Sequence, residues 1–218
     1  MTTSAREQTM LTLYENPGWG SAIVEAQLAF YGLPHRLITA GDVFDDLPAR
    51  AALMQINPLA QLPTLVLDDG QIITESAAMT LLLADLAAST ALVPGPGEAE
   101  RPAFLRWLIF LVAAIYPAFS YADAPARFVS DTEADAFKAR VGAGKMENWR
   151  LREAEAARRG GPWFLGGRMT AVDVFIMVMV HWTPREAWFR AEAPHLAAIA
   201  ARGAALPVFA PVMLRNFG

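Results

Sequence analysis

A change in sequence pattern near residue 89 divides this chain of 218 residues into two parts. Before it, short runs of β-branched and large apolar side chains alternate with stretches that repeat apolar residues at helical spacing. Residues 89–100 then combine a Pro-Gly-Pro-Gly run with acidic side chains, a composition typical of a linker. The sequence therefore predicts a flexible leader at 1–9, a first domain at 10–88, a linker at 89–100 and a second domain at 101–218.

The first domain is predicted to follow the order βαβαββα, which resembles that of a thioredoxin-like domain. An Asp-Gly pair at 69–70, between two β-rich runs, is typical of a hairpin turn and joins the last two strands. The second domain shows only helical patterns, and these predict helices over 101–121, 132–159, 171–183 and 194–205. The predicted fold class is therefore α/β followed by all-α.

Composition excludes several kinds of site. The sequence contains no cysteine, so it has no disulfide, no thiolate zinc site and no cysteine nucleophile of its own. Its three histidines lie far apart, and no metal is expected. The 18 Lys and Arg and the 22 Asp and Glu give a net charge of −4, which is unsuited to binding nucleic acid. Any sulfur chemistry must therefore use a thiol that belongs to a ligand.

The longest uncharged run, at 107–122, is shorter than the roughly 20 residues of a membrane-spanning helix. It also contains Pro117, which is expected to bend the helix. We therefore expect a buried helix and no membrane association. A second helix has a clear start, because Thr170 and Asp173 have the spacing of a capping box and precede an apolar run. Its predicted role is structural.

Two segments of the first domain carry groups suited to an amino-acid or peptide ligand. Leu62 and Pro63 follow Gln61 at the start of a predicted strand, where the backbone of Leu62 can pair with an extended peptide. Glu75 and Ser76 open a helix, so that the hydroxyl and nearby N–H groups can bind a carboxylate while Glu75 accepts from an ammonium group. Taken singly, the two segments are better explained by an ordinary strand-start proline and by a helix cap.

In combination, these features resemble the cytosolic glutathione transferase family, in particular its bacterial, beta-like and serine-type members. The resemblance runs from residue 10 to the C-terminus and rests on the strand and turn at 13–18, the segment 61–64, the pair at 75–76 and the cap at 170–173. It implies that glutathione is the co-substrate and that the bond before Pro63 is cis. Leu62, beside Gln61, is then expected to pair with the cysteinyl backbone of glutathione, and Glu75 and Ser76 to bind its γ-glutamyl head.

The sequence departs from the family pattern where a catalytic hydroxyl or thiol is expected. Aligned on the Pro-Gly turn at 17–18, the positions used by serine-type and cysteine-type members hold Trp19 and Gly20. We predict Ser21 as the first candidate to stabilise the glutathione thiolate, because it stands at a helix start that favours anions. Tyr14 is the second candidate. As alternatives, Ser21 is a helix cap and Tyr14 is a packed strand aromatic.

The second substrate is expected in a pocket that includes Trp19, Tyr116 and Trp182, although core packing is an alternative for the aromatic side chains. The predicted function is a cytoplasmic, homodimeric glutathione transferase of the detoxification type. In that function the thiolate attacks a small hydrophobic electrophile by conjugation, isomerisation, or reduction of a peroxide or disulfide. The alternative is a non-catalytic regulator or interaction protein that keeps the same scaffold, and the Trp19-Gly20 pair motivates it.

Overall fold

The computed structural model describes residues 10–218, and the predicted leader at 1–9 lies outside them. The chain forms two compact units. Unit 1 contains the described residues up to Ser89 together with Pro207–Gly218, and unit 2 is Thr90–Leu206. The division differs from the predicted second domain at 101–218, because the C-terminal segment belongs to unit 1. The predicted linker also begins unit 2, where Leu92 is buried and its carbonyl accepts a hydrogen bond of 2.8 Å from the N–H of Ala171.

Unit 1 has the predicted βαβαββα order. Its elements are β1 (Leu11–Glu15), α1 (Ser21–Tyr31), β2 (His35–Thr39), α2 (Leu47–Met54), β3 (Thr64–Val66), β4 (Ile72–Ile73) and α3 (Ser76–Leu86). The strands lie in the order β2-β1-β3-β4, with β1 parallel to β2 and antiparallel to β3. Leucines of β1 and β3 pack with α1 and α3 in one buried cluster, so the two helices cover the sheet and hold it together.

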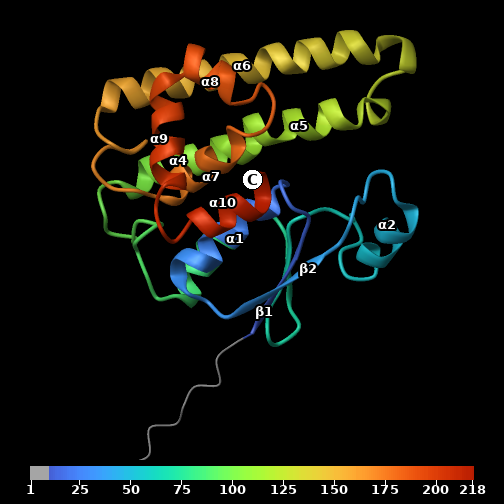
Figure 1. Ribbon diagram of the computed structural model, residues 1–218, viewed down its shortest axis with the longest axis horizontal. Coiled ribbons are helices and arrows are strands. Elements are labelled where there is room, and N and C mark those ends of the chain that lie inside the picture. The colour runs from blue at the N-terminus through green and yellow to red at the C-terminus, as the bar shows by residue number, and fades with distance from the viewer. Residues whose placement is uncertain (1–9) are drawn as a thin grey trace, which may run out of the picture. The chain divides into compact units, whose positions relative to one another are not determined.

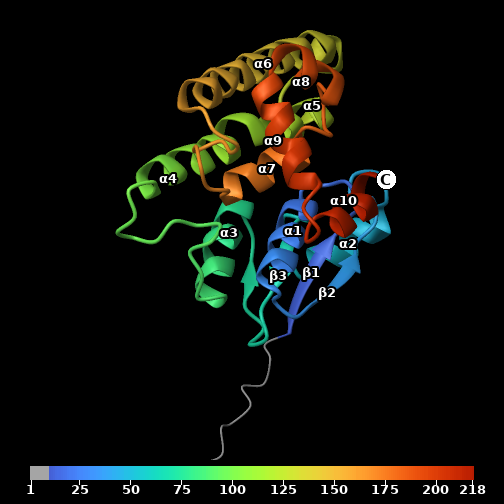
Figure 2. The same cartoon turned by 60° about the vertical axis from the view of Figure 1, so that its left-hand side comes forward.

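The strand register brings three chain segments to one end of this sheet. Tyr14 at the end of β1 pairs with Thr64 at the start of β3, and Leu65 pairs with Ile73 at the end of β4. Both pairings are antiparallel, so the end of β1, the start of β3 and the end of β4 lie at the same end of the sheet. The loop after β1, the segment before β3 and the start of α3 therefore leave the sheet at the same end (Figure 2).

A C-terminal helix that the sequence did not predict completes unit 1. This helix, α10 (Ala210–Phe217), lies beside α1 (Figure 1 and Figure 2). Arg215 donates to Glu25 at 2.8 Å and to Glu15 at 3.1 Å, and both carboxylates are buried. The side-chain oxygen of Asn216 accepts from the N–H of Gly18 at 3.0 Å. These bonds fasten α10 to β1, to the loop that follows it and to α1.

Unit 2 consists of helices. They are α4 (Arg101–Phe110), a π-helical turn (Leu111–Ile115), α5 (Tyr116–Asp123), α6 (Ala134–Arg159), α7 (Ala171–Met179), α8 (Glu186–Glu192) and α9 (Pro194–Ala204), with short 3₁₀ turns at Pro125–Arg127 and Asp131–Glu133. Each of the four predicted helical stretches contains a helix, whereas α8 was not predicted. Every residue of α7 is buried, so this helix forms the centre of the unit.

The bend predicted at Pro117 takes the form of the π-helical turn directly before it. Proline has no N–H to donate to the preceding helical turn, and a widened turn accommodates the missing bond. In the same turn, the side-chain amide of Asn148 on α6 donates to the carbonyl of Ala114, at 3.1 Å. A neighbouring helix thus satisfies a backbone group of the irregular turn.

The helical stretch Arg101–Asp123 is long and apolar enough to cross a membrane by length and composition alone. Only 33% of its most apolar window is buried, although four large side chains on one face, Phe104, Leu108, Leu111 and Ile115, are fully buried. The prediction of a buried helix is therefore confirmed for one face of this stretch only. It is the one helix of this length and composition within residues 10–218. The absence of membrane association stays a prediction.

The predicted capping box at the start of α7 is confirmed. The carboxylate of Asp173 accepts from the N–H of Thr170 at 2.7 Å and from the N–H of Phe164 at 2.7 Å. Both cap residues are buried, and burial raises the pKa of Asp173 to about 6. The cap therefore pairs backbone donors that would otherwise be buried without a partner.

Candidate functional site

Hydrogen bonds from side chains of unit 1 hold the segment before β3 in place. The peptide bond between Leu62 and Pro63 is cis, as the resemblance implied. The amide of buried Asn57 donates to the carbonyl of Gln61 and to the hydroxyl of Thr64, both at 3.0 Å, and that hydroxyl donates to the same carbonyl at 2.8 Å. Asn57 therefore fixes the segment. The sequence did not indicate this role, because an Asn before a proline also has the pattern of an ordinary turn.

The start of α3 is chemically open. Glu75 is exposed and has φ 64°, a left-handed conformation that is unfavourable for a residue with a side chain. Within residues 10–218, neither the Glu75 carboxylate nor the Ser76 hydroxyl has a hydrogen bond or ion pair, and no side chain caps the helix. The alternative of an ordinary side-chain cap is therefore wrong here. The two groups remain available, with the first N–H groups of the helix, to a ligand.

Three of the predicted site residues gather in one cluster of unit 1. Tyr14, Trp19 and Leu62 pack against a small buried core formed by Val43, Leu53 and Ala60. The ring of Trp19 also lies against that of Phe44, with 5.1 Å between ring centroids. The sequence predicted these three residues for separate roles, and the fold brings them together at the end of the sheet where Glu75 also lies.

Ser21 is fully buried and its hydroxyl has two partners in the preceding turn. It accepts from the N–H of Asn16 at 3.2 Å and donates to the carbonyl of Asn16 at 3.1 Å. The N-cap position of α1 is Gly20, so these bonds close the turn after β1 and do not cap the helix. To donate to a sulfur, Ser21 must first release the carbonyl of Asn16. Its catalytic role stays a prediction, and this geometry moves Tyr14 ahead of it as a candidate.

Tyr116 and Trp182 lie together in unit 2, whereas Trp19 belongs to unit 1. The ring centroids of Tyr116 and Trp182 are 5.5 Å apart in an edge-to-face arrangement, and the ring centroid of Phe119 lies 5.1 Å from that of Trp182. Such contacts are those of a packed aromatic group. Their predicted part in a second-substrate pocket stays a prediction.

A buried amine that the sequence did not indicate lies beside this aromatic group. Lys145 of α6 is 5% exposed, and its ammonium lies 4.0 Å from the centroid of the Phe119 ring and donates to the hydroxyl of Thr183 at 2.8 Å. Burial lowers the pKa of Lys145 to about 8. The one signal for it was its rarity, because the sequence has only two lysines, and rarity does not indicate burial.

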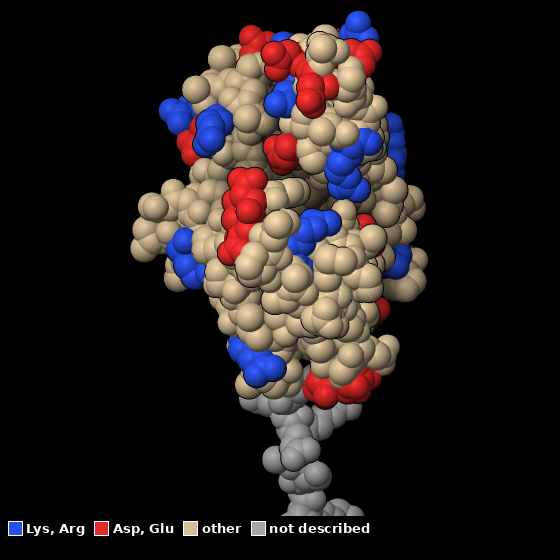
Figure 3. All heavy atoms as spheres, turned by 90° about the vertical axis from the view of Figure 1, so that its right-hand side faces the viewer, with Lys and Arg blue, Asp and Glu red and all other residues tan. Residues whose placement is uncertain are grey.

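Charged side chains are not sorted by sign on the face shown in Figure 3, where Lys and Arg lie among Asp and Glu. In the part of the chain that the structure describes, no three His, Cys, Asp or Glu side chains form a group that could hold a metal ion. The candidate site of unit 1 therefore consists of hydrogen-bonding groups and an aromatic cluster around the end of the sheet.

Comparison with known proteins identifies relatives over nearly the whole chain. The family model for the glutathione S-transferase N-terminal domain matches residues 21–86. The GST-like protein YncG of Escherichia coli strain K12 is 34% identical over 207 residues, 95% of this chain and 98% of YncG.

Solved structures agree. A glutathione transferase from Methylococcus capsulatus is 25% identical with a TM-score of 0.75, covering 94% of this chain and 98% of its own. A glutathione transferase homolog from Sulfitobacter, solved with bound glutathione, has a TM-score of 0.79 at 21% identity, covering 96% and 99%. The sequence match to YncG and the shared fold lead to one conclusion: the chain belongs to the glutathione S-transferase family.

Proposed function

We propose that this protein is a glutathione transferase that binds glutathione at the end of the unit 1 sheet and activates its thiol. One observation carries the proposal: the start of α3 leaves the Glu75 carboxylate and the Ser76 hydroxyl without protein partners. A γ-glutamyl head has one ammonium and one carboxylate, which match an acceptor and a set of donors at a helix start. The backbone of Leu62, with Gln61 beside it, pairs with the cysteinyl part of the same ligand.

Thiol activation requires a hydrogen-bond donor near the sulfur. A free thiol has a pKa near 8.5, and lowering it by about two units makes the thiolate the main form at neutral pH. Tyr14 and Ser21 are the candidate donors. The thiolate then forms a carbon–sulfur bond with a small hydrophobic electrophile, and the electron pair moves to the leaving group or to a polar atom of the electrophile. Trp19, which belongs to the same unit as Tyr14 and Ser21, contributes apolar surface to its binding.

Glutathione binding is tested by calorimetry with the wild type and the Glu75→Ala variant. We expect the variant to bind roughly 10- to 100-fold more weakly, because a hydrogen bond to a charged group is lost. Asp68→Ala is the matched control, since it removes an exposed carboxylate from the β3–β4 turn of the same unit. Equal affinity of the two variants would contradict the proposed site.

Catalysis is tested with a panel of chromogenic electrophiles and hydroperoxides. The Tyr14→Phe and Ser21→Ala variants are compared by the pH dependence of thiolate absorbance in the glutathione complex. The activating group is the one whose loss moves the thiol pKa back toward 8.5. Turnover that neither substitution affects would overturn both assignments.

A second candidate function is a non-catalytic binding protein. The Trp19-Gly20 pair favours it, together with the engagement of the Ser21 hydroxyl by Asn16. Glutathione binding without turnover of any substrate in the panel would support this function. We also propose a cytoplasmic homodimer, and a light-scattering mass of the full chain tests the dimer.

A further inference from the structure

One arginine of α6 lies inside unit 2 with no carboxylate beside it. The neighbouring arginines of this helix are paired: Arg150 with Glu192, and Arg158 and Arg159 with Glu155. Arg152 differs, because it is 0% exposed and forms no salt bridge within residues 10–218. A buried guanidinium without a counter-ion is strongly unfavourable, so its surroundings require explanation.

Aromatic rings surround the Arg152 guanidinium. Its central carbon lies 4.2 Å from the ring centroid of Phe110, 5.4 Å from that of Trp107 and 5.6 Å from that of Trp149. Ring faces attract a cation, which offsets part of its desolvation. They leave the hydrogen-bonding needs of the N–H groups largely unmet, since a ring face is a weak acceptor.

Donors in this cluster outnumber acceptors. One guanidinium nitrogen, Nη1, donates to the carbonyl of Asn148 at 3.1 Å. The other two nitrogens of Arg152, and the indole N–H groups of Trp107 and Trp149, have no acceptor among the residues that the structure describes. All of these side chains are at most 5% exposed. The cluster therefore combines one positive charge with several unpaired donors.

Such a cluster suits an anion better than a water molecule. A water accepts hydrogen bonds, but it also brings two hydrogens that need acceptors. An anion only accepts, and it also neutralises the charge. Burial lowers the pKa of Arg152 to about 9, and at neutral pH the side chain still carries its proton.

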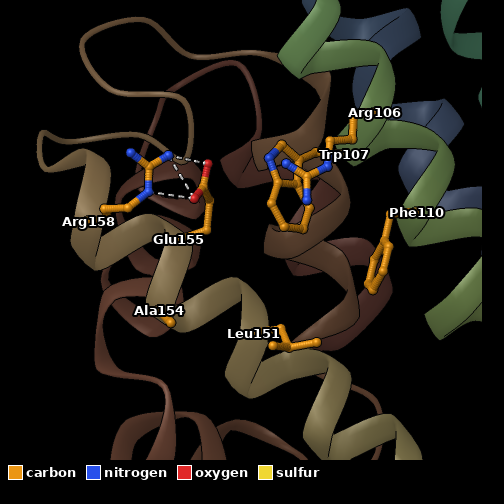
Figure 4. A pocket seen from close by; sticks show the side chains of 7 residues that line it. All are labelled: Arg106, Trp107, Phe110, Leu151, Ala154, Glu155 and Arg158. Carbon is orange, nitrogen blue, oxygen red and sulfur yellow. Dashed lines mark hydrogen bonds and ion pairs between the residues drawn. The ribbon is translucent and has the colours of Figure 1, made fainter.

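A cavity reaches the same rings from the surface. It has a volume of about 280 Å³ and lies between α4 and α6 (Figure 4). Trp107 and Phe110 line it, and the guanidinium of Arg106 lies 4.6 Å from the centroid of the Trp107 ring. Glu155 also lines the cavity, and its carboxylate is paired with Arg158 and Arg159. Arg152 and Trp149 do not line it, so the cavity gives a small ion access to the ring of Trp107, and the ion must move past this ring to reach the guanidinium of Arg152.

We propose that Arg152, Trp107 and Trp149 form a binding site for a small monovalent anion of halide size inside unit 2. The enclosure of all three side chains limits the ligand to a small ion. Because the site joins α4 to α6, the bound anion stabilises the folded state by mass action. This role is independent of glutathione.

Thermal unfolding of the full chain tests the site at constant ionic strength, with sodium gluconate replaced stepwise by sodium chloride or sodium bromide. Gluconate is too large for the enclosed site. We expect the small anions to raise the unfolding midpoint of the wild type by about 2–4 °C. The same midpoint in all three salts would overturn the proposal.

The Arg152→Met variant is expected to lose this dependence, because it removes the charge and keeps an apolar side chain of similar length. Arg150→Met, on the exposed face of the same helix, is the matched control and is expected to keep the dependence. If Arg152→Met fails to fold, Trp107→Phe keeps a ring and removes one donor, and it should at least halve the bromide-induced shift. An equal shift in the wild type and in Arg152→Met or Trp107→Phe would show a general salt effect and refute the site.

Crystals grown in bromide provide a direct readout. We expect an anomalous peak within hydrogen-bond distance of the Arg152 guanidinium. Bromide peaks confined to the protein surface would contradict the proposal.

Discussion

Two helices, α3 in unit 1 and α7 in unit 2, begin with the same kinds of side chain, a hydroxyl and a carboxylate. At α7, Asp173 and Thr170 are buried and bonded to each other and to the backbone. At α3, Glu75 is exposed and neither it nor Ser76 has a partner in the described part of the chain. The difference in partners separates a helix start that stabilises the fold from one that is available to a ligand.

The order of the residues explains the difference. Asp173 stands three positions after Thr170, where a helical turn brings its carboxylate back to the cap. Glu75 stands before Ser76, and its left-handed backbone leads the chain into the helix. Its carboxylate therefore cannot close a capping box. Four predictions test this contrast.

The largest effect is expected at the start of α7, where the cap residues are bonded to each other and to the backbone. Asp173→Ala leaves the N–H groups of Phe164 and Thr170 buried without acceptors. We expect the free energy of unfolding to fall by about 3 kcal/mol, measured by urea denaturation. Glu75→Ala, which removes an exposed and unpartnered carboxylate, is the control and should change it by less than about 0.5 kcal/mol. Similar losses in the two variants would remove the distinction.

The stability of the capped start of α7 should also depend on pH, because Asp173 titrates. The pKa of Asp173 is about 6 in the folded chain and about 4 in the unfolded chain, so the folded state holds more protons between these values. Its contribution to the free energy of unfolding is therefore greatest below pH 4 and decreases as the pH rises to 6, by roughly 2 kcal/mol. Denaturation curves of the wild type and Asp173→Asn at pH 4 and pH 7 measure this change. A pH-independent difference between the two proteins would contradict it.

How much of these features the sequence predicted depends on how local their causes are. The cap at α7 and the βαβαββα order were predicted, because spacing and periodicity within a few residues determine them. The cis bond at Pro63 followed from the resemblance. By contrast, the return of α10 to unit 1 depends on Arg215 meeting Glu25, which is 190 positions away. No local pattern carries such a pairing.

The site residues show the same limit. Glu75 and Ser76 were predicted as ligand groups, but their lack of protein partners is a property of the folded chain. Ser21 was ranked first because it stands at a helix start, and its bonds to Asn16 emerged only from the turn geometry. Lys145 and Arg152 were missed because helical periodicity does not distinguish a buried cation from an exposed one.

A smaller effect is expected at Ser76, the second ligand group at the start of α3. Ser76→Ala removes one neutral donor to the ligand carboxylate and leaves the helix N–H groups in place. We expect glutathione affinity to fall by about 1 kcal/mol, roughly threefold to tenfold, in calorimetry at fixed ionic strength. Thr80→Val is a demanding control, because that hydroxyl bonds the Ser76 carbonyl from within the same helix. A larger affinity loss in Thr80→Val than in Ser76→Ala would indicate that helix integrity, and not the Ser76 hydroxyl, governs binding.

The smallest effect is a gain in stability at Glu75, at the start of α3. Glu75 has φ 64°, which glycine adopts without the steric penalty of a side chain. Glu75→Gly should therefore raise the free energy of unfolding relative to Glu75→Ala by about 0.5–1 kcal/mol, while both variants bind glutathione equally weakly. Chemical denaturation and calorimetry on the same preparations measure the two quantities. If Glu75→Gly is less stable than Glu75→Ala, the left-handed backbone at residue 75 is not strained. If Glu75→Gly is more stable, the chain retains at the start of α3 a backbone conformation that is unfavourable for folding. That conformation is useful because it presents the Glu75 carboxylate to a ligand.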